Sequence, residues 1–238
     1  MNMINWLEKW KNQFPEDVCR IKIQTLDNPG WIVEINLENT GFEIKEFEKV
    51  SFDNSDDDWI VCEIKNKTFT GVGDPYKLED IIDIFKSWIE NKEVYVKCKN
   101  NIKRIEPIYY LRNWYNDQCD GYWEHIFEIK IYDCKNFIWV VEIDIADTYL
   151  EDKPFKKIDI NNGKNDWIIC NVEDNGTHSK DKDDDTDLYK LYGLKWPNRK
   201  YNDCKVFIEH KKFIGKGDQF KLEMILKIFK NWAETGEY

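Results

Sequence analysis

The stretch WIVEINLENT, residues 31–40, sets the architecture of this chain, because it returns as WVVEIDIADT at residues 139–148. Both copies alternate apolar and polar side chains, which is the pattern of a β-strand with one buried face. At the same spacing of 108 positions, DWIVC (58–62) returns as DWIIC (166–170). The chain therefore contains a duplicated module, and each copy is expected to build the same fold.

The repetition extends to both ends of the module. INWLEKWKNQ (4–13) matches IYYLRNWYND (108–117), so that the first segments correspond. FTGVGDPYKLEDIIDIFKSWIE (69–90) matches FIGKGDQFKLEMILKIFKNWAE (213–234), now at a spacing of 144 positions. The change in spacing from 108 to 144 means that the second copy carries 36 additional residues.

These matches predict the domain organisation. We expect a first module at 1–92, a linker at 93–107 and a second module at 108–238. The additional residues of the second module fall at about 171–206 and include the acidic run HSKDKDDDTD. A charged, turn-rich start predicts a mobile loop, whereas LYKLYGLKWP further on is apolar enough to pack on the module.

Within a module, the expected order is helix, strand meander and helix. Apolar residues at helical spacing, Ile4, Leu7 and Trp10, predict a short amphipathic first helix. CRIKIQTL and WIVEINL alternate on either side of the turn signal DNPG and predict a β-hairpin, with three strands to follow. Asp74 and Pro75 predict the N-cap and the first position of the second helix. We therefore predict an α+β fold in which an N-terminal and a C-terminal helix pack on each antiparallel sheet.

The composition favours an acidic protein that works inside the cell. The chain has 46 Asp and Glu against 35 Lys and Arg, a net charge of −11, which argues against binding a nucleic-acid backbone and favours basic partners. No apolar run approaches the length of a membrane span, and MNMINWLEKWKNQ is not a secretory signal. The seven cysteines are an odd number without close pairs, so reduced thiols and a cytoplasmic location are expected.

Three patterns that could bind ligands fit a structural interpretation better. An EF-hand loop starting at Asp181 needs glycine and glutamate where the chain has Thr186 and Tyr192. GVGD (71–74) and GKGD (215–218) precede helices but lack the remaining residues of a phosphate-binding loop. The tryptophans recur at equivalent positions of the two copies and are expected in the core. No metal and no cofactor is predicted.

The stretch CDGYWEH, residues 119–125, is the strongest candidate for chemistry. Its reactive groups are a thiol, two carboxylates and an imidazole: Cys119, Asp120, Glu124 and His125. A zinc site needs three or four closely spaced ligands, and a Cys–His nucleophile pair needs a third orienting group. Copy one has FPEDVCR in its place and no histidine. We therefore favour a turn at the Asp-Gly step with Trp123 anchored in the core, and keep catalysis as the weaker alternative.

Between them, the two copies supply a series of motifs: W…WY.DQCDGYWEH…IKI, LDNPGWIVEINL, DWI.C, F.G.GD and L..I..IFK.W. In this order they resemble the immunity protein 53 family of bacterial polymorphic toxin systems, over residues 4–91 and 108–235. Copy one keeps LDNPGW (26–31) but lacks CDGYWEH, whereas copy two has YDCKNFIW (132–139) in place of the Asn-Pro-Gly turn. The resemblance implies two tandem copies of a small α+β protein that binds and neutralises a cognate toxin in the cytoplasm.

The acidic charge fits such a role, because many toxins act on nucleic acids through basic clefts that an acidic inhibitor can occlude. The expected partner is thus a toxin protein, in particular a basic nuclease-type domain, with no nucleic acid and no membrane. Acidic and aromatic residues of loops are the candidate toxin contacts: Asp56, Asp57, Asp58, Trp59, Trp123, Glu124, His125, Asp183, Asp184, Asp185 and Trp196. Two alternatives stay open, a two-module scaffold for another protein and an enzyme that uses the Cys119, Asp120, Glu124 and His125 cluster.

Overall fold

The computed structural model describes residues 2–15, 18–92, 106–180 and 206–238. We call residues 1–92 module one and residues 108–238 module two. Module one contains α1 (Met3–Lys11), β1 (Ile21–Leu26), β2 (Gly30–Asn36), β3 (Val50–Ser55), β4 (Asp58–Lys65), β5 (Thr68–Gly73) and α2 (Leu78–Ile89). Then follow α3 (Pro107–Gln118), α4 (Trp123–Ile126), β6 (Ile129–Cys134), η1 (Lys135–Phe137), β7 (Ile138–Asp144), β8 (Ile158–Asn161), β9 (Trp167–Lys180), β10 (Val206–Gly217) and α6 (Leu222–Thr235).

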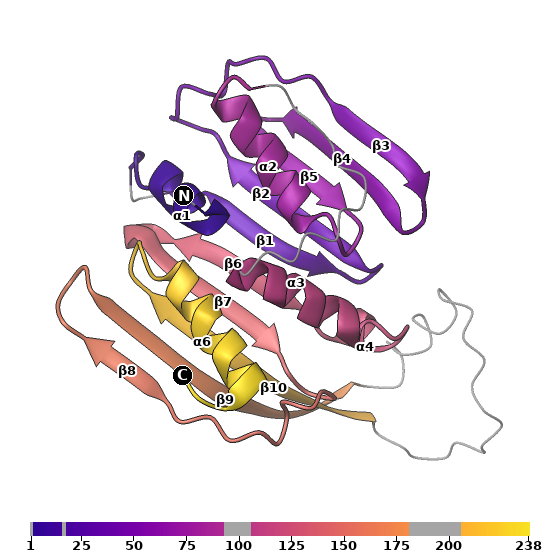
Figure 1. Ribbon diagram of the computed structural model, residues 1–238, viewed down its shortest axis with the longest axis vertical. Coiled ribbons are helices and arrows are strands. Elements are labelled where there is room, and N and C mark those ends of the chain that lie inside the picture. The colour runs from indigo at the N-terminus through magenta and orange to yellow at the C-terminus, as the bar shows by residue number, and fades with distance from the viewer. Residues whose placement is uncertain (1, 16–17, 93–105, 181–205) are drawn as a thin grey trace.

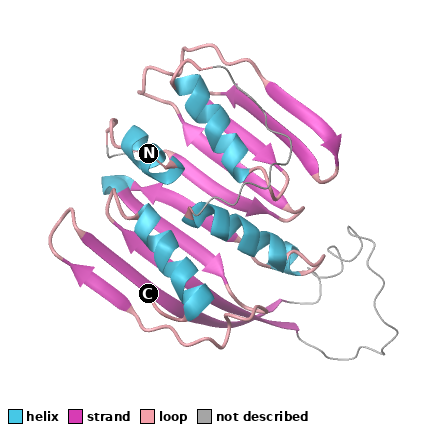
Figure 2. Cartoon of the chain, viewed as in Figure 1, coloured by secondary structure: helices cyan, strands magenta, loops and turns pink. Residues whose placement is uncertain are grey.

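The strands of both modules join into one antiparallel sheet. Its ten strands run in the order β3-β4-β5-β2-β1-β6-β7-β10-β9-β8 (Figure 1). The helices lie on one side of this sheet, as Figure 2 shows in cyan in front of the magenta strands. The predicted α+β fold, with an N-terminal and a C-terminal helix in each copy, is confirmed.

The two modules meet at strands β1 and β6, and this seam has two-fold pseudosymmetry. Ile23 lies opposite Ile131, which is its own counterpart at the spacing of 108 positions. On either side of this pair, Lys22 lies opposite Tyr132 and Gln24 lies opposite Lys130. Lys130 is the counterpart of Lys22 and Tyr132 that of Gln24, so the two pairs occupy equivalent positions related by the pseudo-two-fold axis. The joined sheet therefore has the geometry of a symmetric dimer interface within one chain.

Side chains extend the short ladder of the seam at both ends. The backbone N–H of Ile21 donates to Asp133 Oδ1 at 2.5 Å, and that of Ile129 donates to Thr25 Oγ1 at 2.9 Å. Ile21 and Ile129 are counterparts, and so are Thr25 and Asp133. Two buried N–H groups that the ladder leaves without a carbonyl partner are thus satisfied by equivalent side chains.

The first helix of each module packs across the seam onto the other module. The Lys11 ammonium on α1 lies 4.4 Å from the ring centre of Trp139 and 3.7 Å from Asp133. On α3, the Tyr115 ring lies 5.1 Å from Trp31, and its hydroxyl donates to the Leu26 carbonyl at 3.2 Å. Both modules therefore contribute to one hydrophobic core.

Each first helix also reaches the start of the other module's last helix, with opposite charges in the two copies. Glu8 accepts the N–H of Leu222 at 2.8 Å, at the first position of α6. Its counterpart Arg112 instead pairs with Glu79 in the first turn of α2, at 3.0 Å. Burial raises the pKa of Glu8 to about 7, and burial also raises the pKa of Glu79 to about 7, although Arg112 opposes that rise.

The start of the second helix differs from the prediction. The N-cap of α2 is Lys77, and its side chain makes no capping bond, so the predicted cap at Asp74 is wrong. Asp74 instead accepts the N–H groups of Tyr76 at 2.8 Å and Trp59 at 3.0 Å. The carboxylate therefore closes the turn before the helix and ties it to β4, a contact across the chain that local sequence does not reveal.

The long segment inserted in module two extends a hairpin. Residues 171–180 continue β9 and pair with β10 as far as Lys180, where the sequence predicted a loop. The remainder of the predicted insertion up to 205, and residues 93–105 of the predicted linker, lie outside the described residues. Among the described helices, none has the length and apolar character needed to span a membrane.

Candidate functional site

The CDGYWEH stretch forms a turn held by its own carboxylates. Asp120 Oδ1 accepts the N–H groups of Tyr122 and Trp123 at 2.9 and 3.0 Å. Glu124 in turn accepts the N–H groups of Asp120 and Gly121 at 3.1 and 2.9 Å. This reciprocal arrangement resembles a capping box but closes the turn ahead of the short helix α4, whose N-cap Tyr122 makes no side-chain capping bond. Both carboxylates are thus occupied in holding the loop.

Trp123 anchors this turn in the core. Its side chain is 2% exposed, and its indole N–H donates to the carbonyl of Ala146 at 2.9 Å. The ring packs edge-on against Trp114 at 5.8 Å, on the preceding helix α3. The structure therefore has the turn and the buried tryptophan that the sequence predicts.

The Cys119 thiol is poorly suited to nucleophilic chemistry. It donates to the carbonyl of Tyr115 at 3.4 Å, and burial raises its pKa to about 12. Because the thiolate is the reactive form, little nucleophile is present near neutral pH. His125 lies half-buried on α4. Within the described ranges, no group of three or more His, Cys, Asp or Glu side chains could hold a metal ion.

The two GxGD turns are explained by packing of helix against strand. A Cβ added to Gly71 would lie 2.2 Å from Ile81 Cγ2, and one added to Gly215 would lie 2.2 Å from Ile225 Cγ2. The same side-chain clash at equivalent positions shows that α2 and α6 approach their strands too closely for any residue but glycine. The glycines thus serve the fold, and no phosphate ligand is needed to account for them.

The β3–β4 turn carries three of the predicted contacts, and they differ in accessibility. Asp56 and Asp57 are exposed. Asp58 is 8% exposed and pairs with the Lys77 ammonium at 2.6 Å, as Asp166 does with Lys221 in module two. Asp58 is thus part of the framework, whereas its two neighbours are free for a partner to contact.

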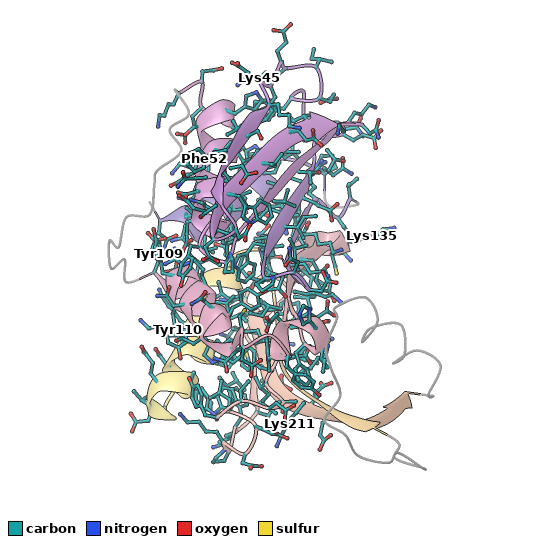
Figure 3. The ribbon with its side chains drawn as sticks, turned by 90° about the vertical axis from the view of Figure 1, so that its right-hand side faces the viewer. Lys45, Phe52, Tyr109, Tyr110, Lys135 and Lys211 are labelled. Carbon is teal, nitrogen blue, oxygen red and sulfur yellow. The ribbon has the colours of Figure 1, made fainter. Side chains whose placement is uncertain are left out.

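The sheet has a second face that no described helix covers. In Figure 3, α3 with Tyr109 and Tyr110 lies to the left of the sheet. Since side chains alternate along a strand, the residues between the buried ones point away from the helices. Trp59, next to the β3–β4 turn, is half-buried at such a position on β4.

At the seam this helix-free face has a hollow of about 600 Å³, lined by both modules. Its charged side chains balance in number, because three are basic and three acidic: Arg20, Lys22, Lys130, Glu34, Asp133 and Glu142. Lys22 pairs with Glu34 at 3.8 Å, and the Tyr132 hydroxyl donates to Glu142 at 2.9 Å. The sequence alone does not reveal this face as a site. The alternation within each strand indicated a polar side, but only the joining of the two modules makes it ten strands wide.

The structure places the predicted contact residues that it describes in two locations. Asp56, Asp57, Asp58 and Trp59 lie around the β3–β4 turn, and Trp123, Glu124 and His125 lie on α4. Of the α4 group, Trp123 and Glu124 are 2% and 5% exposed, which leaves little of either side chain for a partner to touch. The predicted contacts Asp183, Asp184, Asp185 and Trp196 lie outside the described residues.

Comparison with known proteins gives one family. The model of the family described as immunity protein 53 matches residues 2–90 and again residues 108–191. The first match spans α1 to α2, and the second begins at α3 and ends before β10 and α6. No curated protein and no solved structure matches the chain.

Proposed function

Because the chain belongs to the immunity protein 53 family, we propose that it protects the bacterium that makes it by binding a cognate toxin and covering the toxin's active surface. The observation that carries this proposal is the match of one immunity-protein family to both halves of the chain. Protection by occlusion requires a stable surface and no reactive groups of its own. The protein acts in the cytoplasm, before the toxin reaches its target.

The state of the CDGYWEH turn supports binding over catalysis. The carboxylates of Asp120 and Glu124 cap the turn, and burial raises the pKa of the Cys119 thiol to about 12. Such groups stabilise a loop but do not turn over a substrate. An immunity protein of this kind neutralises its toxin in proportion to its amount, as an inhibitor does.

The charge of the chain supports a basic toxin as the partner. At a net charge of −11, the protein attracts a basic nuclease-type domain and speeds its encounter. Exposed Asp56 and Asp57, with Trp59 beside them, are the contact residues that the described part of the chain offers. The acidic insertion, with Asp183, Asp184, Asp185 and Trp196, enters the proposal on its sequence alone.

Co-expression with the cognate toxin, for which a toxin gene next to this one is the candidate, tests the proposal. We expect the toxin alone to stop growth, and the pair to grow and to co-purify. Growth arrest with both proteins soluble would refute immunity. Binding that is unaffected by salt, or a toxin that is acidic, would refute the electrostatic steering but not the immunity function.

The same assay separates binding from an enzyme that uses the CDGYWEH cluster. His125→Ala removes the only imidazole of that cluster. Occlusion predicts that the variant still protects, whereas a catalytic mechanism through this imidazole predicts that protection is lost. Thermal unfolding of the variant serves as the control for folding.

A further inference from the structure

The two modules offer a comparison within one molecule, because the same positions face away from the helices in both. We define the module-one lobe as the outward side chains of β3, β4 and β5 with the β3–β4 turn. The module-two lobe is the equivalent surface of β8, β9 and β10 with the β8–β9 turn. Over their equivalent residues the lobes share the same strand pairing, so a difference between their side chains there is not imposed by the fold.

The lobes differ in charge. In module one the charged outward residues are Asp53, Asp56, Asp57, Glu63 and Lys65, a net charge of −3. In module two the described equivalents are Asp159, Lys164, Glu173, Lys212 and Lys216, a net charge of +1. Of the two lobes, module one is net acidic in its described residues and module two is not, so the fold does not require the acidic charge.

The lobes also differ in their apolar centre. Val72 on β5 lies opposite Ile32 on β2 and opposite Val61 on β4, so three aliphatic side chains adjoin across three strands. Trp59 follows on the same side of β4, and all four side chains are half-buried. This arrangement forms a continuous apolar patch beside the acidic residues.

In module two the equivalent row is broken. Lys216 lies opposite Val140 on one side and opposite Ile169 on the other, so a charged side chain stands where module one has valine. An exposed lysine in the middle of the row prevents a dry contact with a partner. Among the described side chains of the two lobes, those of module one combine an apolar centre with a charged surround, which is the anatomy of a protein–protein interface.

From this comparison we propose that the cognate toxin docks on the module-one lobe, through an apolar surface surrounded by basic side chains. The inference rests on the proposed immunity function and specifies where it takes place. Val61, Val72 and Trp59 form the dry centre, which Ile32 of the neighbouring strand β2 extends, and Asp56 and Asp57 attract the basic rim. Module two holds module one in place across the seam and leaves its own lobe free.

Matched substitutions in the full-length protein test the inference. Val61→Lys on β4 is paired with Ile169→Lys at the equivalent position of β9. The double change Asp56→Lys with Asp57→Lys is paired with the double change Asp159→Lys with Glu173→Lys, which alters the net charge by the same amount on exposed residues of module two. The probe is the toxin of the co-expression test, carrying a substitution that abolishes its activity, and Kd is measured by calorimetry. Since Asp56 and Asp57 are exposed, their variant folds even if Val61→Lys does not.

We expect each module-one variant to weaken toxin binding by about tenfold or more and each module-two variant to change it by less than about twofold. If the wild-type protein binds the toxin and the module-one variants bind it equally well, the docking site is refuted but immunity is not. The same holds if only the module-two variants lose affinity. A wild-type protein that neither binds this toxin nor protects against it overturns the proposed function and the docking site together.

Discussion

Glu8 gives the clearest test of the contact that joins α1 to module two. Its side chain is 2% exposed and accepts the N–H of Leu222 at 2.8 Å, at the start of α6. Burial raises its pKa from the ordinary value of 4.5 to about 7, although hydrogen bonds from the first turn of α6 favour the charged form. The folded protein therefore holds the Glu8 proton more tightly than the unfolded chain does.

The sign of the effect on stability follows from this difference. The contribution of Glu8 is fully present below about pH 4.5 and is lost as the pH rises through about 7. A rise in pKa of this size corresponds to about 3 kcal/mol at pH 8, as an upper bound. Glu8→Gln keeps the carbonyl oxygen that accepts the N–H of Leu222 and removes the buried charge.

We therefore expect Glu8→Gln to raise the free energy of unfolding at pH 8 by up to about 3 kcal/mol and to change it little at pH 4.5. Urea unfolding at both pH values measures the difference. Glu38→Gln, on an exposed loop, controls for the loss of one negative charge. The same pH dependence in Glu8→Gln as in wild type, or lower stability at pH 8, would refute the reasoning.

Three further outcomes follow from the packing. Gly71→Ala places a Cβ 2.2 Å from Ile81 Cγ2 and should lower the free energy of unfolding by about 1–3 kcal/mol in a urea melt; wild-type stability would contradict the close approach of α2 to β5. Asp133→Ala leaves the Lys11 ammonium, 1% exposed, without its counter-ion and should cost about 3–5 kcal/mol in the same melt, whereas a loss below about 1 kcal/mol would contradict a buried pair at the seam. The Cys119 thiol, with its pKa raised to about 12, should resist iodoacetamide at pH 8 and react in urea, as followed by mass spectrometry; rapid alkylation of the folded protein would contradict its burial.

Much of the fold could be predicted because the chain contains two copies of one module, whose sequences can be compared with each other. The recurrence of WIVEINLENT predicted two copies with the same order of elements along the chain, and the structure confirms the β1–β2 hairpin around DNPG. The predicted meander is wrong, because β2 pairs with β5 and β3 lies at the edge of the sheet. Local patterns failed where a partner lies far along the chain. Asp74 looked like a helix cap by its position, but it bonds to Trp59 on another strand.

The joining of the modules could not be predicted for the same physical reason. Ile23 pairs with Ile131 because the edge strands β1 and β6 hydrogen-bond to each other. The alternating pattern of each strand predicts a strand but does not indicate which other strand it pairs with. The candidate site shares this limit. Asp56 and Asp57 were found from their charge, whereas Val61 and Val72 became candidates only when the register placed them side by side.

The most direct test of the central claim is a titration of the purified toxin's activity with this protein. Occlusion predicts that activity falls linearly and reaches zero at one equivalent, with an intact complex recovered by size-exclusion chromatography. Inactivation by a small fraction of an equivalent, with chemically altered toxin and no complex, would contradict occlusion and point to an enzyme.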